Sequence, residues 1–277
     1  MAVRIALAQV TPVWEDPVAT LRKVEPFVAK AAADGASIIC FPEQFGTGWD
    51  PSSISNTQPV DGEIFHTLSE YARHHNIAVL GSLRLQEEGK LFNACIVAGK
   101  DGTLLTGYRK VHLFSPLMEG ASYHPGENIT MFRIGDMAFG IAICYDLRFA
   151  PLFRVYASGG ADCMLVPSAW PASRMDAWEL FIRTRAIENQ MFVAGINTVG
   201  ITPVDGYSGN SMVAGPTGNI IVRASDREGV FFADLDPDLI RQARIAMHVD
   251  EDRQTRLYHE MARTSKKNNR GGDQTDD

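Results

Sequence analysis

Short apolar segments bounded by turn-forming residues recur along most of the chain. Most are rich in Val, Ile, Phe or Ala and have Gly, Pro, Asn or Asp at their ends, which is typical of β-strands. We expect strands at 3–10, 37–41, 77–83, 92–98, 104–109, 137–144, 163–166, 191–196, 209–214, 219–223 and 229–234. The last three follow one another with no helical pattern between them, so we expect hairpins at the edges of a sheet.

Segments between these strands carry apolar residues at helical spacing. They predict helices over 21–31, 64–72 and 178–187. Pro26 lies inside the first pattern and predicts either a kink or a late start of that helix. Glu179 and Arg183 stand four residues apart on the polar face of the third, where they can pair. Strands that alternate with helices indicate an α/β fold in which helices cover the sheets.

The chain contains no Gly/Ser-rich or Pro-rich linker that would divide it. We therefore expect one domain over residues 1–263. The remaining segment, 264–277, is polar throughout and cannot bury an apolar face. It is expected to be disordered, or to become ordered only against a partner.

Composition and charge narrow the class of protein. With 277 residues, of which 45% are apolar and 21% charged, the chain can build a large core, which excludes an intrinsically disordered protein. Its 26 basic and 33 acidic residues leave a net charge of −7. This charge argues against nucleic acid and against an anionic membrane surface as partners.

Several features favour a cytoplasmic protein. Residues 1–10 alternate like a strand and do not form the long apolar stretch of a signal peptide. No apolar run reaches the roughly 18 residues of a membrane span. The 4 cysteines show no Cys-x-x-Cys spacing, which argues against a zinc site and against structural disulfides.

Sequence motifs for other common chemistries are missing. There is no P-loop, no Gly-rich dinucleotide fingerprint, no His-Glu-x-x-His and no Gly-x-Ser-x-Gly. The sequence therefore offers no positive evidence for a nucleotide, a metal ion or a serine nucleophile.

Glu43, Lys110 and Cys144 each stand at or just after the end of a predicted strand. In α/β folds, ligands bind at the carboxyl ends of strands, and a nucleophile placed there can use backbone N–H groups to stabilise an oxyanion. A lone Cys at a strand end is nevertheless more often a core residue, and a Lys or Glu is more often a solvated surface charge. Composition and spacing leave both interpretations open.

Five segments in order resemble the nitrilase superfamily, the carbon–nitrogen hydrolases. Segments 41–43 (FPE), 108–113 (YRKVHL) and 143–149 (ICYDLRF) resemble the three signature segments of that family. Segment 125–127 (PGE) resembles its Pro-Gly element, and 185–190 (RAIENQ) resembles a further helix. One such segment would be weak evidence, but five in the same order are specific.

The resemblance implies a fold and a mechanism. The fold is a four-layer αββα sandwich in which two sheets face each other with helices outside. Cys144 would attack an amide carbon and form a thioester, Glu43 would accept the thiol proton, and Lys110 would stabilise the oxyanion. Glu119 matches the family's second glutamate and would position Lys110 or the substrate amide. The resemblance implies no metal or organic cofactor, a small-molecule amide substrate, and a homodimer or larger homo-oligomer.

Other residues near these segments carry weaker expectations. The backbone N–H of Tyr145 is a candidate oxyanion donor. Asp146 and Arg148 are expected to fix the turn after Cys144 by ion pairing rather than to touch substrate. Trp170 follows another strand and is either a pocket wall or a core residue. Arg174 is either a binding group for a substrate carboxylate or an exposed residue at a helix start.

Within the family, the segments around Trp170-Pro171, Trp178 and 185–200 look most similar to omega-amidases, which cleave small dicarboxylic monoamides, 2-oxo acids included. Simple aliphatic amidases and N-carbamoyl amino acid hydrolases remain alternatives. A nitrilase is less favoured, because those enzymes usually have Trp where this chain has Tyr145. An acyltransferase and a non-catalytic binding protein on the same fold remain alternatives from other classes.

Overall fold

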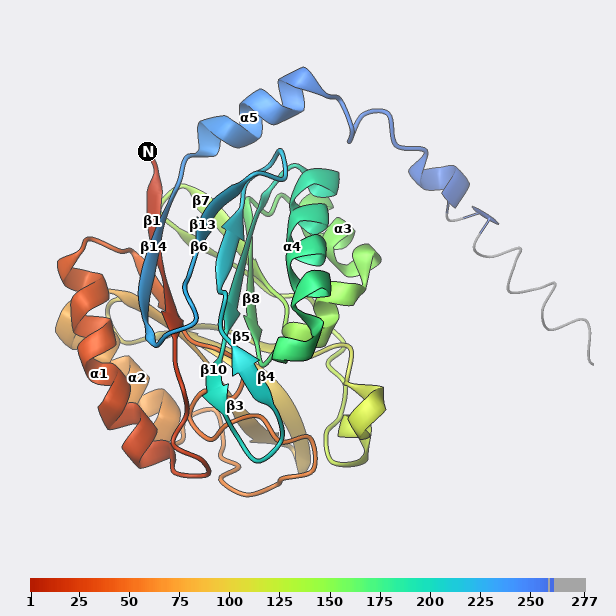
Figure 1. Cartoon of the computed structure of the whole chain (residues 1–277). Coiled ribbons are helices and arrows are strands. Elements are labelled where there is room, and N and C mark those ends of the chain that lie inside the picture. Colours follow the sequence, from red (N-terminus) through yellow and green to blue (C-terminus); the bar gives the residue numbers. More distant parts are fainter. Residues whose placement is uncertain (259, 262–277) are drawn as a thin grey trace, which may run out of the picture.

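The computed structural model describes residues 1–258 and 260–261 and forms two six-stranded sheets packed face to face (Figure 1). The first sheet has the order β14-β1-β2-β3-β4-β5. Its strands are β1 (Val3–Gln9), β2 (Ile38–Cys40), β3 (Ala78–Glu87), β4 (Lys90–Ala98), β5 (Leu104–Arg109) and β14 (Gly229–Leu235).

The second sheet has the order β13-β12-β9-β8-β7-β6. Its strands are β6 (Met131–Ile134), β7 (Met137–Ile141), β8 (Cys163–Ser168), β9 (Phe192–Asn197), β12 (Met212–Ala214) and β13 (Ile220–Arg223). A separate two-stranded hairpin consists of β10 (Val199–Ile201) and β11 (Gly206–Ser208).

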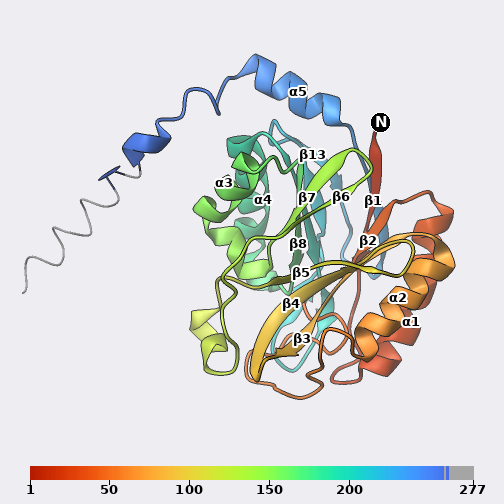
Figure 2. The same cartoon turned by 180° about the vertical axis from the view of Figure 1, so that it is seen from behind.

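The two sheets share one topology. Each has three parallel strands, β1-β2-β3 in the first and β7-β8-β9 in the second, flanked on both sides by antiparallel strands. The connections between the parallel strands are the helices α1 (Pro17–Ala33), α2 (Glu63–His75), α3 (Ala150–Ser158) and α4 (Met175–Asn189). These helices cover the outer faces of the sandwich (Figure 2). The expected αββα architecture is confirmed.

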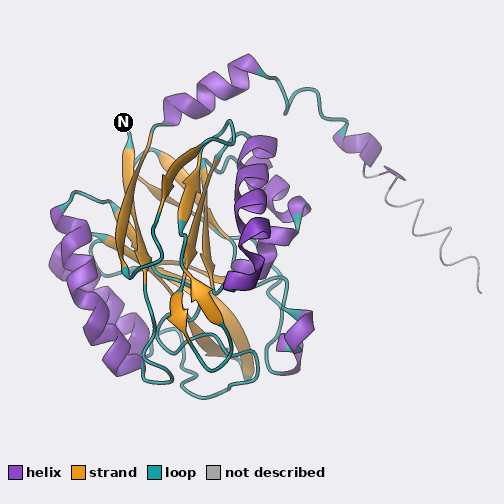
Figure 3. Cartoon of the chain, viewed as in Figure 1, coloured by secondary structure: helices purple, strands orange, loops and turns teal. Residues whose placement is uncertain are grey.

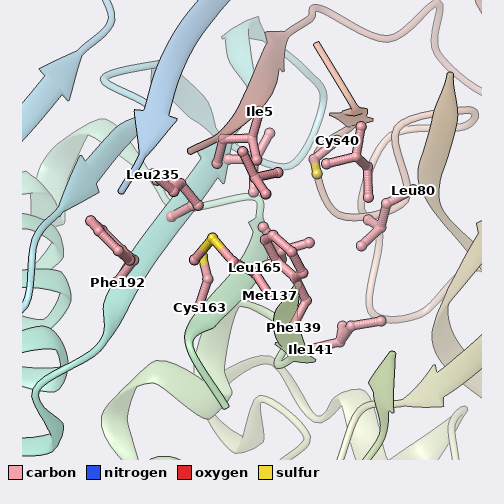
Figure 4. Packing of buried hydrophobic residues seen from close by; sticks show 14 of the residues in the cluster. Ile5, Cys40, Leu80, Met137, Phe139, Ile141, Cys163, Leu165, Phe192 and Leu235 are labelled. Atoms are coloured by element: carbon pink, nitrogen blue, oxygen red, sulfur yellow. The ribbon is translucent and has the colours of Figure 1, made fainter. Parts of the chain in front are cut away.

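Successive residues of a buried strand point alternately to the two faces of its sheet, and so they pack into two different layers of the fold. Ile5 and Leu7 point between the sheets and pack with Phe139 and Leu165 from the second sheet (Figure 4). The intervening Ala6 points the other way, into the layer beneath α1 and α2. Parallel strands buried on both faces need apolar residues at nearly every position, which explains the continuous apolar segments in the sequence.

The expected late start of the first helix is wrong. Helix α1 begins at Pro17 and continues through Pro26 to Ala33. Asp16 accepts a hydrogen bond from the backbone N–H of Ala19 at 2.9 Å and caps the helix, and proline is well suited to the first turn. Pro26 then removes one internal hydrogen bond without ending the helix.

Several predicted strands have other bounds in the structure, and two of the differences concern the site. The strand predicted over 137–144 stops at Ile141, so Cys144 lies outside it, in a 3₁₀ turn. The strand predicted over 209–214 begins at Met212. Of the late connections, β12 and β13 form the expected hairpin, but β13 and β14 lie in different sheets, so the chain crosses between the sheets there.

The carboxyl ends of the parallel strands all reach one end of the sandwich, where loops gather (Figure 3). Helix α5 (Pro237–Ala246) lies at the opposite end and leads the chain away from the body (Figure 1). No helix within the described residues is long and apolar enough to cross a membrane. The predicted polar tail, 264–277, and the predicted domain boundary at 263 lie outside the described residues.

Candidate active site

The structure brings Glu43, Lys110 and Cys144 to the same end of the sandwich. Glu43 follows β2 and Cys144 follows β7, and both of these strands have parallel neighbours. Lys110 follows β5, which runs in the direction of β3 because two antiparallel pairings separate them. All three side chains therefore leave their strands at equivalent ends, as expected.

Cys144 occupies a tight turn that a buried carboxylate holds in place. Its backbone φ is +43°, which L-residues rarely adopt. Asp146 accepts hydrogen bonds from Ile143 N at 2.9 Å and from the Tyr108 hydroxyl at 2.7 Å. Its other oxygen lies 2.9 Å from His112 N and 2.8 Å from His112 Nδ1. Asp146 thus ties the turn to the end of β5.

The expected pairing of this carboxylate with Arg148 is wrong. The Arg148 guanidinium instead lies over the rings of Trp170 and Phe181, 5.1 and 5.2 Å from their centroids. The carboxylate of Asp146 already has acceptor contacts on both oxygens, which leaves Arg148 free to face the pocket described below.

We expect Asp146→Asn to lower the free energy of unfolding by about 2–3 kcal/mol, because the amide replaces a charged acceptor by a donor facing other donors. Turnover should fall as well, since the turn at Cys144 loses its anchor. Urea unfolding measures the first effect. Asp136→Asn, at an exposed turn, is the matched control and should stay within about 0.5 kcal/mol of wild type. Equal stability of the two variants would contradict the anchoring role.

A buried ammonium group bridges two carboxylates beside Cys144. Lys110 Nζ lies 2.8 Å from Glu43 Oε1 and 2.9 Å from Glu119 Oε2. The three side chains are at most 1% exposed. Asn93, from β4, donates through the same Nδ2 atom to both carboxylates at 2.8 Å. Lys110 is therefore held rigidly between two anions.

Electrostatics keep Lys110 and Glu119 ionised. Burial alone would lower the pKa of Lys110, but the charges of Glu119 and Glu43 outweigh it, so the pKa lies above its ordinary value. Burial raises the pKa of Glu119, whereas Lys110 and hydrogen bonds from Phe114 N and Asn93 lower it. The lowering effects together are larger than the effect of burial. The net result is a pKa below the ordinary value.

Cys144 rests as a neutral thiol. Removal of water around the sulfur is the main cause of a pKa well above the ordinary value, and the adjacent Glu43 carboxylate raises it further by repulsion and hydrogen bonding. Lys110 and the backbone at Ala169 act in the opposite direction. Glu43 also accepts a hydrogen bond from Ala169 N at 3.0 Å. A base beside a neutral thiol can take its proton as the sulfur attacks.

The Pro-Gly element supports Lys110 from the backbone side. Gly126 N donates to Lys110 O at 2.8 Å. A Cβ atom at Gly126 would lie only 2.2 Å from Arg109 O, so a side chain cannot be accommodated without moving the end of β5. This contact gives a physical reason for glycine in the 125–127 segment.

Above Cys144 opens a pocket of about 450 Å³, its solvent-open mouth included. Five of its thirteen lining residues are aromatic. The lining consists of Trp49, Lys110, Phe114, Leu117, Cys144, Tyr145, Arg148, Ala169, Trp170, Pro171, Arg174, Asp205 and Tyr207. In the described part of the chain, no group of three or more His, Cys, Asp or Glu side chains is arranged to hold a metal ion.

Each of the less certain sequence predictions has a place in this pocket. Trp170 is both wall and core: it is 3% exposed and packs on Trp178 as well as lining the pocket. Arg174 is exposed at the end of a short 3₁₀ helix, and its guanidinium lies 5.3 Å from the centroid of the Phe114 ring in the pocket wall. The half-buried ring of Tyr145 lines the pocket.

Sequence reasoning missed Asn93, Trp49, Phe114, Asp205 and Tyr207. Asn93 carried a signal, because it is a polar residue inside an otherwise apolar strand, and such residues need a buried partner. The others come from loops and from the β10–β11 hairpin, whose positions over the pocket depend on tertiary packing.

Comparison with known proteins agrees with this geometry. The profile of the Carbon-nitrogen hydrolase family matches residues 4–245. Omega-amidase NIT2 of Danio rerio is 32% identical over 249 residues, covering 86% of this chain and 90% of its own. The 2-oxoglutaramate amidase of Bacillus subtilis (strain 168) is 29% identical over 244 residues, covering 87% and 94%.

Solved structures give the same result. A CN-hydrolase superfamily protein from Xanthomonas campestris superposes with a TM-score of 0.86 at 28% identity, covering 92% of this chain and 98% of its own. An amidase from Nesterenkonia sp. superposes with a TM-score of 0.83 at 28% identity, covering 94% and 96%. A variant of the latter carries the acetamide moiety of fluoroacetamide on its active-site cysteine. The chain belongs to the carbon–nitrogen hydrolases of the nitrilase superfamily, in the amidase and omega-amidase branch.

Proposed function

We propose that this carbon–nitrogen hydrolase is an omega-amidase, which releases ammonia from the terminal carboxamide of a small dicarboxylic monoamide, 2-oxo acids included. Amide hydrolysis through a cysteine acyl-enzyme is the chemistry of the branch to which the chain belongs. The observation that carries the substrate class is a pair of arginines, Arg148 and Arg174, which line the pocket above Cys144 and have no carboxylate partner among residues 1–258.

Acylation begins when Cys144 Sγ attacks the amide carbon. Glu43 accepts the thiol proton, so that a thiolate need not exist beforehand. The bond forming between sulfur and carbon leaves negative charge on the former carbonyl oxygen. Lys110, already fixed between two carboxylates, stabilises that charge together with the backbone N–H of Tyr145. Glu119 acts through Lys110, which it holds in position.

The attack produces a tetrahedral intermediate, and when this intermediate collapses its carbon–nitrogen bond breaks. Glu43 returns its proton to the departing nitrogen, which leaves as ammonia, and a thioester remains on Cys144. Water then attacks the thioester carbon while Glu43 takes one of its protons. The second collapse breaks the carbon–sulfur bond, returns that proton to sulfur and releases the carboxylic acid.

The far end of the substrate meets the arginines. Neither guanidinium has a hydrogen-bond acceptor or a carboxylate partner within residues 1–258; Arg148 stacks on Trp170 and Arg174 on Phe114. Stacking orients a guanidinium and leaves its N–H groups available for a carboxylate. The aromatic residues of the same pocket suit the methylene groups of a short aliphatic chain.

We expect Arg174→Ala to lower kcat/KM for succinamate and glutaramate by roughly 10- to 100-fold, mainly through KM, because a charge-assisted hydrogen bond to the carboxylate is lost. Propionamide, which has no carboxylate, should be hydrolysed as by wild type. Ammonia release measures both. Arg22→Ala, on an exposed position of α1, is the matched control.

A wider panel tests the class itself. It adds 2-oxoglutaramate, benzamide, an N-carbamoyl amino acid and a simple nitrile. A wild-type preference for propionamide, the carbamoyl compound or the nitrile over the monoamides would overturn the omega-amidase assignment. It would also be overturned if Arg174→Ala changed kcat/KM for the monoamides and for propionamide by the same factor. Product that forms only when an amine acceptor is supplied would indicate an acyltransferase.

The proposal extends to assembly and location. We propose a homodimer or larger homo-oligomer in the cytoplasm. Val155 on α3 and Leu180 and Ile187 on α4 are between 51% and 64% exposed on the outer helical layer, which supports a partner surface there. All 4 cysteines are free thiols, which supports a reducing compartment.

A further inference from the structure

The β10–β11 hairpin belongs to neither large sheet, yet it supplies one wall of the pocket. Tyr207, in β11, is 6% exposed and packs with Trp49 and Ala169, while Phe114 and Val204 pack around them. Ala169 also contacts Glu43 through its backbone. The Tyr207 ring therefore lies close to the reacting groups, in a lining that also includes Asp205.

The hydroxyl of Tyr207 is buried and has no hydrogen-bond partner among the described residues. The side chain of Thr202 approaches the Tyr207 oxygen and lowers the pKa of Tyr207 by hydrogen bonding, but the contact falls short of hydrogen-bond geometry. The Thr202 hydroxyl is engaged in its own turn, where it accepts from Val204 N at 3.2 Å and from Asp205 N at 3.3 Å. Buried hydroxyl groups in native proteins are nearly always paired, so an unpaired one that lines a pocket is a candidate partner for an atom of a bound ligand.

Chemistry limits what that atom can be. Burial, followed by the negative charge of Glu43, raises the pKa of Tyr207, so the hydroxyl keeps its proton and can donate it. In the proposed function, the other polar atoms of the substrate already have partners: Lys110 for the amide oxygen, Glu43 for the nitrogen, and the two arginines for the carboxylate. What is left is an acceptor on the carbon chain between the amide and the carboxylate.

We propose that Tyr207 is a specificity-determining residue whose hydroxyl donates a hydrogen bond to an oxygen on the substrate chain, the 2-oxo group of a 2-oxo dicarboxylic monoamide. This inference rests on the proposed function and deepens it. It makes the enzyme favour 2-oxo monoamides over the same chain without the oxo group, because that analogue leaves the buried hydroxyl unpaired.

The test compares wild type with Tyr207→Phe on two substrates of equal length, 2-oxoglutaramate and glutaramate. Phenylalanine keeps the ring that packs on Trp49 and Ala169. We expect kcat/KM for 2-oxoglutaramate to fall about tenfold, through KM, while glutaramate changes by less than about twofold. Tyr71→Phe, whose hydroxyl bonds Leu21 O on the far side of the molecule, is the matched control.

The outcomes separate the two proposals. Equal losses on both substrates, or no loss on either, overturn the role of Tyr207 and leave the omega-amidase assignment standing. A wild-type enzyme that hydrolyses propionamide but neither monoamide overturns the proposed function and this inference with it. A shared loss that goes with a lowered melting temperature of Tyr207→Phe would identify a structural role only.

Discussion

Cys144→Ala should abolish ammonia release from every amide that wild type hydrolyses, with kcat reduced by on the order of 10⁵- to 10⁶-fold. The reason is that no second cysteine, and no serine or threonine, is among the described residues that line the pocket. Without the sulfur, no thioester forms, and the remaining groups can only bind the amide. Initial rates of ammonia release measure the loss, and intact-mass spectrometry of wild type during turnover should show an acyl adduct that the variant lacks.

Cys163→Ala is the matched control for this experiment. Cys163 lies in β8, is fully buried between the sheets, and burial raises the pKa of its thiol. Its replacement should leave kcat unchanged. Brief treatment with an alkylating agent should modify Cys144, which is half-buried, ahead of the three buried cysteines. Turnover by Cys144→Ala above about a thousandth of wild type would remove this residue from the role of nucleophile.

The sequence was most informative where strand ends and local motifs coincide. Glu43, Lys110 and Cys144 could be placed together because each follows a strand, and equivalent strand ends meet at one edge of a sheet. The alternation of strands with helices predicted sheets covered by helices, and the four-layer arrangement was implied by the resemblance to a family. The resemblance to a family then distinguished reactive residues from ordinary core and surface residues, which spacing alone did not do.

Other features depend on contacts between distant segments. The role of Asn93 exists only because β4 places its amide between two carboxylates that come from loops. The positive φ of Cys144 depends on Asp146 and on groups from β5 that are more than 30 residues away along the chain. Tyr207 reaches the pocket through a short hairpin that has no distinctive pattern of its own.

Lys110→Met should cause the largest loss of stability. It leaves Glu43 and Glu119 buried without their cation, which costs about 3–5 kcal/mol at neutral pH. Hydrolysis should fall by at least roughly 10²- to 10³-fold, since the oxyanion loses its fixed positive charge. Urea unfolding followed by circular dichroism measures the first effect. Lys90→Met, on an exposed strand position, is the matched control and should change stability by less than about 0.5 kcal/mol.

The loss of stability in Lys110→Met should depend on pH in a defined direction. In wild type, Lys110 holds the pKa of Glu119 in the folded protein below its ordinary value, which is near 4.3. The ionised Glu119 therefore stabilises the fold at any pH above that ordinary value. This stabilisation is lost as the pH falls through the pKa that Glu119 has in the folded protein. In Lys110→Met, burial acts unopposed by the ammonium and raises the pKa of Glu119, which makes the ionised carboxylate destabilising until it is protonated. The difference in unfolding free energy between variant and wild type should therefore be greatest at about pH 7–8 and shrink toward pH 5.

Adding Glu119→Gln to the variant should restore part of the stability at neutral pH, because one uncompensated charge is removed. A loss that is the same at every pH, or a double variant no more stable than the single one, would show that packing of the lysine side chain and not its charge supports the site.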